Sequence, residues 1–239
     1  MTPNEMRLRL EAEMDILAGN SAPAISNYLA SLFLNKAILS ILTRIRKQGV
    51  EKEEYNKQFT APLKGSTGDS FTSELVESSE NHKNAEFWSL PDNLYLLLQE
   101  SATLDKRDCF SGELIEADVF PVTEDYYNVN IRNYQKMPYC DETSGTALVW
   151  RISYGSDSQK KSELVTSKNC NIYKYNFRYL KRPTDIVVDL ENPENQVQTE
   201  IYKEFHEDIV SRAALIGIEN MRQLSRFESK AALNAQEGL

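Results

Sequence analysis

Two segments with helical periodicity bracket this chain, and they constrain its fold more than any other feature. Ile25–Arg46 lies near one end and Lys203–Lys230 lies at the other. The stretch between them is rich in tyrosine and β-branched residues, which favour strands. We therefore predict an α+β fold with long helices at both ends. The middle is predicted to be an antiparallel β-sheet or a small β-barrel or sandwich.

The first residues of the chain carry the signals of a helix start. Thr2 can act as the cap, Pro3 suits the first helical position, and Glu5 completes a capping box. Apolar residues then recur on one face, and Gly19-Asn20 follows as a stop. These apolar residues are Met6, Leu10, Met14 and Leu17.

A second, more apolar helix is predicted over Ala24–Lys47, with Gly49 as its terminator. Its apolar arc is too wide for one face on a small core, so we expect it to be either central or shared between subunits. The following apolar residues, with three from the C-terminal helix, are our candidates for a subunit interface: Ile25, Leu29, Phe33, Ile38, Ile41, Ile45, Ile209, Ile216 and Met221.

We do not expect this apolar helix to cross a membrane. A membrane span needs about 20 mostly uninterrupted apolar residues. Four polar residues interrupt this one: Asn27, Asn35, Lys36 and Arg44. The residues after Met1 also lack the basic region and apolar run of a signal peptide.

Period-2 patterns predict strands in the middle of the chain. The predicted strands are Glu116–Val122, Ala147–Tyr154, Lys161–Thr166, Ile172–Tyr179 and Ile186–Val188, with a short helix capped by Thr123 after the first. We predict four segments that form one integrated domain. These are residues 1–50, an N-terminal helical segment; 51–86, a loop or projection; 87–190, the β-rich middle; and 191–239, the C-terminal helix and tail.

The charge of the chain argues against tight binding to nucleic acid. The net charge is −9 over 239 residues, with a pI of about 4.9. Strong binding to a phosphate backbone needs clustered Lys and Arg. An acidic surface beside DNA is still compatible with sliding rather than gripping.

The cysteines and histidines predict neither disulfides nor zinc. Cys109, Cys140 and Cys170 form an odd and widely spaced set, which argues against a disulfide framework and fits a reducing cytosol. No Cys-x-x-Cys is present, and His82 and His206 are the two histidines. We therefore expect no metal site, because nothing has ligand spacing.

Three short motifs have the residue types of catalytic or binding sites, but each has a simpler explanation. Lys64-Gly65-Ser66-Thr67-Gly68 lacks the order and the flanking elements of a phosphate loop. His206-Glu207-Asp208 falls on a helix, where adjacent side chains point apart. Glu51, Glu53 and Glu54 alternate with lysines, which is typical of a solvated face.

One strand has a composition that could bind single-stranded nucleic acid. Tyr173, Tyr175, Phe177 and Tyr179 alternate with Lys174 and Arg178. Aromatic side chains beside cations can stack on bases. The simpler interpretation is a strand with its aromatic side in the core.

Several short segments occur in an order similar to that of one group of viral structural proteins. Tyr28-Leu29, followed after five residues by Asn35-Lys36-Ala37, is similar to a YLNKA-type N-terminal helix. Further pieces follow in similar order: Leu90-Pro91-Asp92, Val119–Tyr127, Val149–Ile152, Tyr179–Pro183, His206–Val210, Ala213-Ala214 and Glu219. On these segments the chain resembles head–tail connector ring proteins of crAss-like tailed bacteriophages. Residues 51–80 have no counterpart.

The resemblance implies a structural virion protein that forms a ring in the phage neck or tail, joins the portal to the tail and surrounds the DNA channel. Such proteins form rings, commonly of twelve copies, and have no cofactor, metal or active site. The implied partners are further copies, the portal, other neck and tail rings, and DNA that passes without sequence-specific binding during genome ejection. The resemblance also implies assembly in the bacterial host cytoplasm. It transfers no functional residue, because the segments are fold and interface signatures.

Two other classes of function stay open. One is a nucleic-acid-binding module that uses the Tyr173–Tyr179 strand. The other is a hydrolase, which would need a pocket with convergent titratable groups.

Overall fold

The computed structural model describes residues 1–19, 24–69, 71–106, 114–141, 145–155 and 160–236. The chain divides into two compact units. The helical unit comprises Met1–Leu63 and Pro183–Leu239, and the sheet unit comprises Lys64–Arg182. The fold is therefore α+β, as predicted.

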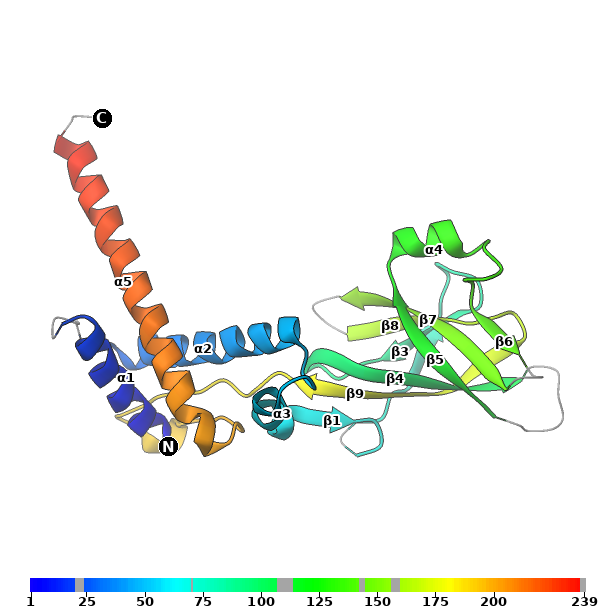
Figure 1. Ribbon diagram of the computed structural model, residues 1–239, viewed down its shortest axis with the longest axis horizontal. Coiled ribbons are helices and arrows are strands. Elements are labelled where there is room, and N and C mark those ends of the chain that lie inside the picture. Colours follow the sequence, from blue (N-terminus) through cyan, green and yellow to red (C-terminus); the bar gives the residue numbers. More distant parts are fainter. Residues whose placement is uncertain (20–23, 70, 107–113, 142–144, 156–159, 237–239) are drawn as a thin grey trace. The chain divides into compact units, whose positions relative to one another are not determined.

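The helical unit is built from four α-helices and three short 3₁₀ turns in the described part of the chain (Figure 1). The helices are α1 (Pro3–Leu17), α2 (Asn27–Gln48), α3 (Glu54–Thr60) and α5 (His206–Gln236), and the turns are Ala61–Leu63, Pro193–Asn195 and Lys203–Phe205. The predicted capping box is confirmed, because Thr2 Oγ1 accepts from the Glu5 amide and the Glu5 carboxylate accepts from the Thr2 amide. α2 starts later than predicted because Ser26 Oγ accepts from the Leu29 amide and so caps it.

α5 packs against both α1 and α2, and Gly217 marks the point where the three helices meet. A Cβ atom at Gly217 would lie 3.0 Å from Met14 Cε and 3.3 Å from Phe33 Cδ2. The missing side chain therefore allows α5 to approach both neighbours closely. Apolar side chains of all three helices are buried in the helical unit: Met6, Leu10, Met14, Ala30, Phe33, Leu34, Ala37, Ile38, Ile209, Val210, Ala213 and Ala214.

α2 is buried on a second side by an extended segment of its own chain. Asn35 Nδ2 donates to the Ile186 carbonyl at 3.0 Å, and Asn35 Oδ1 accepts from the Ile186 amide at 2.8 Å. Ser31 Oγ accepts from the Val188 amide at 2.9 Å. The predicted strand Ile186–Val188 is therefore wrong, because the backbone of this segment pairs mainly with side chains of α2 rather than with a sheet.

These contacts also explain the polar residue in the apolar helix. In the described part of the chain, α2 is long and apolar enough to cross a membrane by length and composition. Here it is a core helix, and Asn35 satisfies backbone groups of a buried segment.

The sheet unit is a nine-stranded mixed sheet in the part of the chain that the structure describes. The strands are β1 (Lys64–Ser66), β2 (Leu75–Ser78), β3 (Ala85–Ser89), β4 (Leu94–Lys106), β5 (Ile115–Val122), β6 (Tyr139–Asp141), β7 (Thr146–Gly155), β8 (Lys160–Val165) and β9 (Cys170–Lys181). Their order is β1-β9-β4-β5-β7-β8-β3-β2, with β6 paired to β7.

The predicted middle was an antiparallel sheet or a small barrel or sandwich, and the observed sheet is mixed because β5 and β7 are parallel. Parallel neighbours need a long crossover connection, usually a helix. That crossover contains α4 (Glu124–Asn130), whose predicted cap is confirmed by the hydrogen bond from the Tyr126 amide to Thr123 Oγ1.

The sheet is curled, and the segment that contains β1 and β2 connects its two ends. At its start, β1 pairs with β9, and the Thr67 amide continues this pairing by donating to the Phe177 carbonyl. At its end, β2 pairs with β3 at the opposite end of the strand order. One short segment therefore supplies both terminal strands of the order, so the sheet must bend to bring its two ends near each other.

The two faces of the curled sheet carry different clusters, because alternate residues of a strand point to opposite faces. Val149 and Leu164 belong to the larger cluster, which also includes Trp88, Tyr175, Phe177 and Tyr179. The helix α4 lies over the other face (Figure 1). There Tyr126 and Tyr127 of α4 pack against the buried cluster of Trp150, Ile152 and Val165.

Residues 51–86 are not the loop or projection that we predicted. They form α3, a 3₁₀ turn, β1, β2 and the first residues of β3. Two of these strands lack the alternating apolar pattern from which strands are predicted. β2 is exposed along its whole length, and β1 has only three residues.

The expectation of no disulfide is also corrected. Cys140 of β6 is bonded to Cys170 of β9, with Cα atoms 6.8 Å apart. The two residues are 30 positions apart in sequence, so their pairing depends on strand order and not on a spacing motif.

Filling the space at Gly217 tests the helix packing. We expect Gly217→Leu to lower the free energy of unfolding by about 1–3 kcal/mol, because the new side chain collides with Met14 and Phe33. The matched control is Glu219→Leu, which lies on the exposed side of the same helix and should change stability by less than about 0.5 kcal/mol. Urea unfolding measures both, and equal effects would contradict the packing described.

Peptide mapping tests the disulfide. Mass spectrometry of an unreduced digest should find the peptides of Cys140 and Cys170 linked. Under oxidising conditions, Cys170→Ser should lower the free energy of unfolding by about 3–4 kcal/mol, because the unfolded chain loses a closed loop. Detection of the unlinked peptides alone would contradict the bond.

Candidate assembly surfaces

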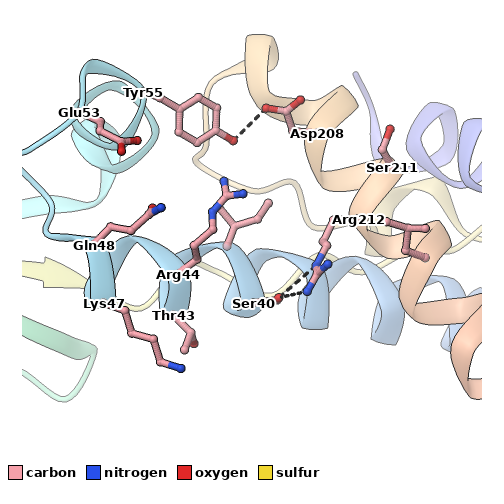
Figure 2. Close-up of a pocket in the computed structure, with 12 residues that line it drawn as sticks. Ser40, Thr43, Arg44, Lys47, Gln48, Glu53, Tyr55, Asp208, Ser211 and Arg212 are labelled. Atoms are coloured by element: carbon pink, nitrogen blue, oxygen red, sulfur yellow. Dashed lines mark hydrogen bonds between the residues drawn. The ribbon is translucent and has the colours of Figure 1, made fainter.

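A groove of about 1080 Å³ lies between α2 and α5 in the helical unit, and we call it the α2–α5 groove. Figure 2 shows side chains of both helices pointing into it, with Tyr55 from α3 closing one side. The groove is lined by Ser40, Ile41, Thr43, Arg44, Lys47, Gln48, Glu53, Tyr55, Asp208, Ser211, Arg212 and Leu215.

Tyr55 and Asp208 form the fixed side of the groove. The Tyr55 hydroxyl donates to the Asp208 carboxylate at 2.9 Å, and the Arg44 guanidinium lies 5.8 Å from the Tyr55 ring centroid. Burial raises the pKa of Tyr55 to about 12, and the hydrogen bond and charge of Asp208 add to the rise. The hydroxyl therefore remains protonated and keeps donating to Asp208 well above neutral pH.

Three cations line the groove and have no carboxylate partner in the part of the chain that the structure describes. Arg212 donates to Ser40 Oγ from Nη2 at 3.0 Å and from Nε at 3.2 Å (Figure 2). Among the described residues, no carboxylate oxygen lies within 4 Å of the charged nitrogens of Arg44, Lys47 or Arg212. Arg212 and Asp208 do not pair with each other, because Arg212 donates to Ser40 and Asp208 accepts from Tyr55.

The exposed strand β2 is a second surface suited to contact. All residues from Glu74 to Ser78 are exposed, including the apolar Leu75 and Val76 with 52% and 46% of their surface accessible. β2 is at the end of the strand order and pairs with β3. Glu77 forms an ion pair with Lys161 at 2.7 Å. The described contacts include no charged partner for Glu74 or Glu80.

A buried histidine joins α4 to the sheet. His82 Nδ1 lies 2.8 Å from the carboxylate of Glu163, which is fully buried, and His82 Nε2 lies 3.1 Å from the half-exposed carboxylate of Glu124. The Ser79 hydroxyl also donates to Glu163. Because the serine contacts the carboxylate and not the imidazole, this arrangement does not activate a serine nucleophile. It anchors the α4 crossover, and 81 residues separate His82 from Glu163 in sequence, so no spacing motif reveals the cluster.

The predicted interface residues differ in how much of their surface is exposed. Ile25, Phe33, Ile38, Ile41, Ile45 and Ile209 are buried inside the helical unit. Ile216 and Met221 are half-buried, and Leu29 is exposed. The apolar arc of α2 is therefore largely covered within one subunit, and the surface residues around the groove were not predicted as a group.

The aromatic strand is a core strand. Tyr175, Phe177 and Tyr179 of β9 are buried, and the Tyr175 hydroxyl donates to Glu100 at 2.7 Å. Burial and the Glu100 carboxylate raise the pKa of Tyr175. Tyr173 alone of the four predicted aromatics is exposed, so β9 does not present a row of stacking rings.

The residues of the other sequence motifs do not form binding or catalytic sites in the described structure. His206 is buried with Nε2 3.0 Å from the Ile201 carbonyl, and burial lowers its pKa. Glu207 pairs with Arg9, whereas Asp208 faces the groove, so these neighbours do not form one site. Lys64–Ser66 form β1 and not a phosphate loop. Among the described residues, no group of three His, Cys, Asp or Glu side chains could hold a metal ion.

Comparisons with known proteins agree with a role in assembly. A family model described as phage tail ring protein 3/4 matches residues 1–228. Ring protein 4/5 of Bacteroides phage crAss001 is 25% identical over 196 residues, which cover 78% of this chain and 75% of that protein. Each match includes residues of both the helical unit and the sheet unit.

Two substitutions test the histidine cluster. Glu163→Ala should lower the free energy of unfolding by about 3–5 kcal/mol, because it removes the buried partner of His82. Glu124→Ala removes the exposed partner of the same imidazole and should cost no more than about 1 kcal/mol. Chemical unfolding gives both values, and a larger cost for Glu124→Ala would show that the anchor lies elsewhere.

Proposed function

This chain belongs to the phage tail ring protein 3/4 family, and we propose that its copies close into a ring between the portal and the rest of the tail. The family is one of structural ring proteins, so the chain is a structural component of the virion and not an enzyme. The observation that carries the proposal is the family match over residues 1–228, which includes most of both units.

We further propose that the ring has twelve copies, surrounds the DNA channel and is assembled in the bacterial host cytoplasm. The net charge of −9 supports a channel role, because an acidic lumen repels phosphate and lets DNA pass without sticking. The burial of three aromatic side chains in β9 gives no support to the alternative nucleic-acid-binding module.

Assembly of the purified chain tests this proposal. Native mass spectrometry and electron microscopy should show closed rings of twelve copies, and these rings should bind the purified portal of the same phage. Removal of the portal, or its replacement by an unrelated ring protein, is the control for specificity. A protein that stays monomeric at all concentrations and binds no portal or tail component would refute the proposal.

A further inference from the structure

We propose that neighbouring copies contact each other by placing the exposed strand β2 of one copy, with its flanking glutamates, in the α2–α5 groove of the next. The inference rests on the ring proposed above and identifies the surfaces that make it. The occupant of the groove is thus a second copy of this chain.

The groove has the charge of a site for an acidic segment. Arg44, Lys47 and Arg212 face it, and none has a carboxylate within 4 Å among the described residues. The chain as a whole carries a net charge of −9, so a groove with three such cations differs in charge from the rest of the chain. Carboxylates from a partner would complement them and set the orientation of the contact.

Protein is a better occupant than DNA. Glu53 and Asp208 also line the groove, so its cations alternate with carboxylates. Separate carboxylates of a protein segment can meet the cations alone, whereas a continuous phosphate backbone would also meet Glu53 and Asp208. Leu215 lies on the wall with 52% of its surface exposed, which suits an apolar side chain. A volume of about 1080 Å³ accommodates a short peptide segment rather than a duplex.

The β2 segment has the complementary chemistry. Glu74 and Glu80 flank it and have no described charged partner, and Leu75 and Val76 between them are exposed. Other acidic stretches are less suitable. On α1, Glu11 pairs with Arg7 and Glu13 accepts from Ser211, so these carboxylates are already engaged.

The contact also has the symmetry that a ring requires. The groove and β2 are different surfaces, so copies join head to tail. Such heterologous contacts generate a closed ring when the rotation between neighbours allows closure, whereas a contact between identical patches gives a dimer.

Charge reversal on each surface tests the contact in the full-length chain. The groove variant is Lys47→Glu with Arg212→Glu, and the strand variant is Glu74→Lys with Glu80→Lys. All four side chains are exposed, so both variants should retain the wild-type circular dichroism spectrum. We expect each variant alone to raise the concentration at which rings dissociate by roughly 100-fold, because like charges then meet.

An equimolar mixture of the two variants tests whether β2 is the partner of the groove. Every contact in a ring that alternates the two variants joins opposite charges, because the reversed groove meets the reversed strand and the native groove meets the native strand. Mixing should therefore restore rings, which native mass spectrometry identifies by equal numbers of both masses. Arg132→Glu with Lys168→Glu is the control, since it reverses two exposed cations outside the groove and should leave assembly unchanged.

The outcomes separate this inference from the proposed function. Normal rings from both variants would overturn the contact and leave the ring proposal intact. Loss of rings without rescue in the mixture would also overturn it, because β2 would not be the partner of the groove. Binding of a DNA duplex that is lost in the groove variant, with rings unaffected, would assign the groove to phosphate. Failure of the wild-type chain to assemble would refute both proposals.

Discussion

Burial of α2 on two sides is the interaction on which the helical unit depends. One side packs against α5, where Gly217 removes the steric barrier to close approach. The other side receives Ile186 and Val188, whose backbone groups are satisfied by Asn35 and Ser31. A helix with so wide an apolar arc would otherwise expose much of that arc to water. The chain thus covers α2 with parts of itself that are more than 150 positions away.

This arrangement changes where contacts between copies are to be sought. A wide apolar arc predicts either a central helix or a shared one, and most of this arc is buried within its own subunit. The two candidate surfaces, the α2–α5 groove and β2, are mainly polar and charged, with a few apolar residues between the charges. Such surfaces suit a subunit that must be stable before it meets its neighbours, because an interface that is less apolar than a core does not drive aggregation of the free subunit.

Local signals predicted much of the secondary structure, and pairing between distant segments limited the rest. Thr2 and Glu5, Gly49 and Thr123 mark helix ends correctly because capping depends on neighbouring residues. The parallel pair of β5 and β7, the Cys140–Cys170 bond and the contact of His82 with Glu163 depend on strand order, which periodicity does not specify. The groove was not predicted because it depends on the packing of α5 against α2, which places Arg44 and Arg212 on one groove although they are far apart in sequence.

The sheet unit is a continuous stretch of chain inserted into the helical unit, which the chain leaves at Leu63 and re-enters at Pro183. During synthesis, residues 64–182 are complete before α5 exists, so the sheet unit can fold while α1 and α2 still lack their main packing partner. Domains generally fold as units during translation. Closing the helical unit then requires a contact between distant ends of the chain, and such nonlocal contacts are slow to form. In the folded sheet Lys64 of β1 pairs with Leu180 of β9, so the points where the chain leaves and re-enters the helical unit are close together. The folded sheet unit therefore shortens the effective loop that must close when α5 meets α1 and α2.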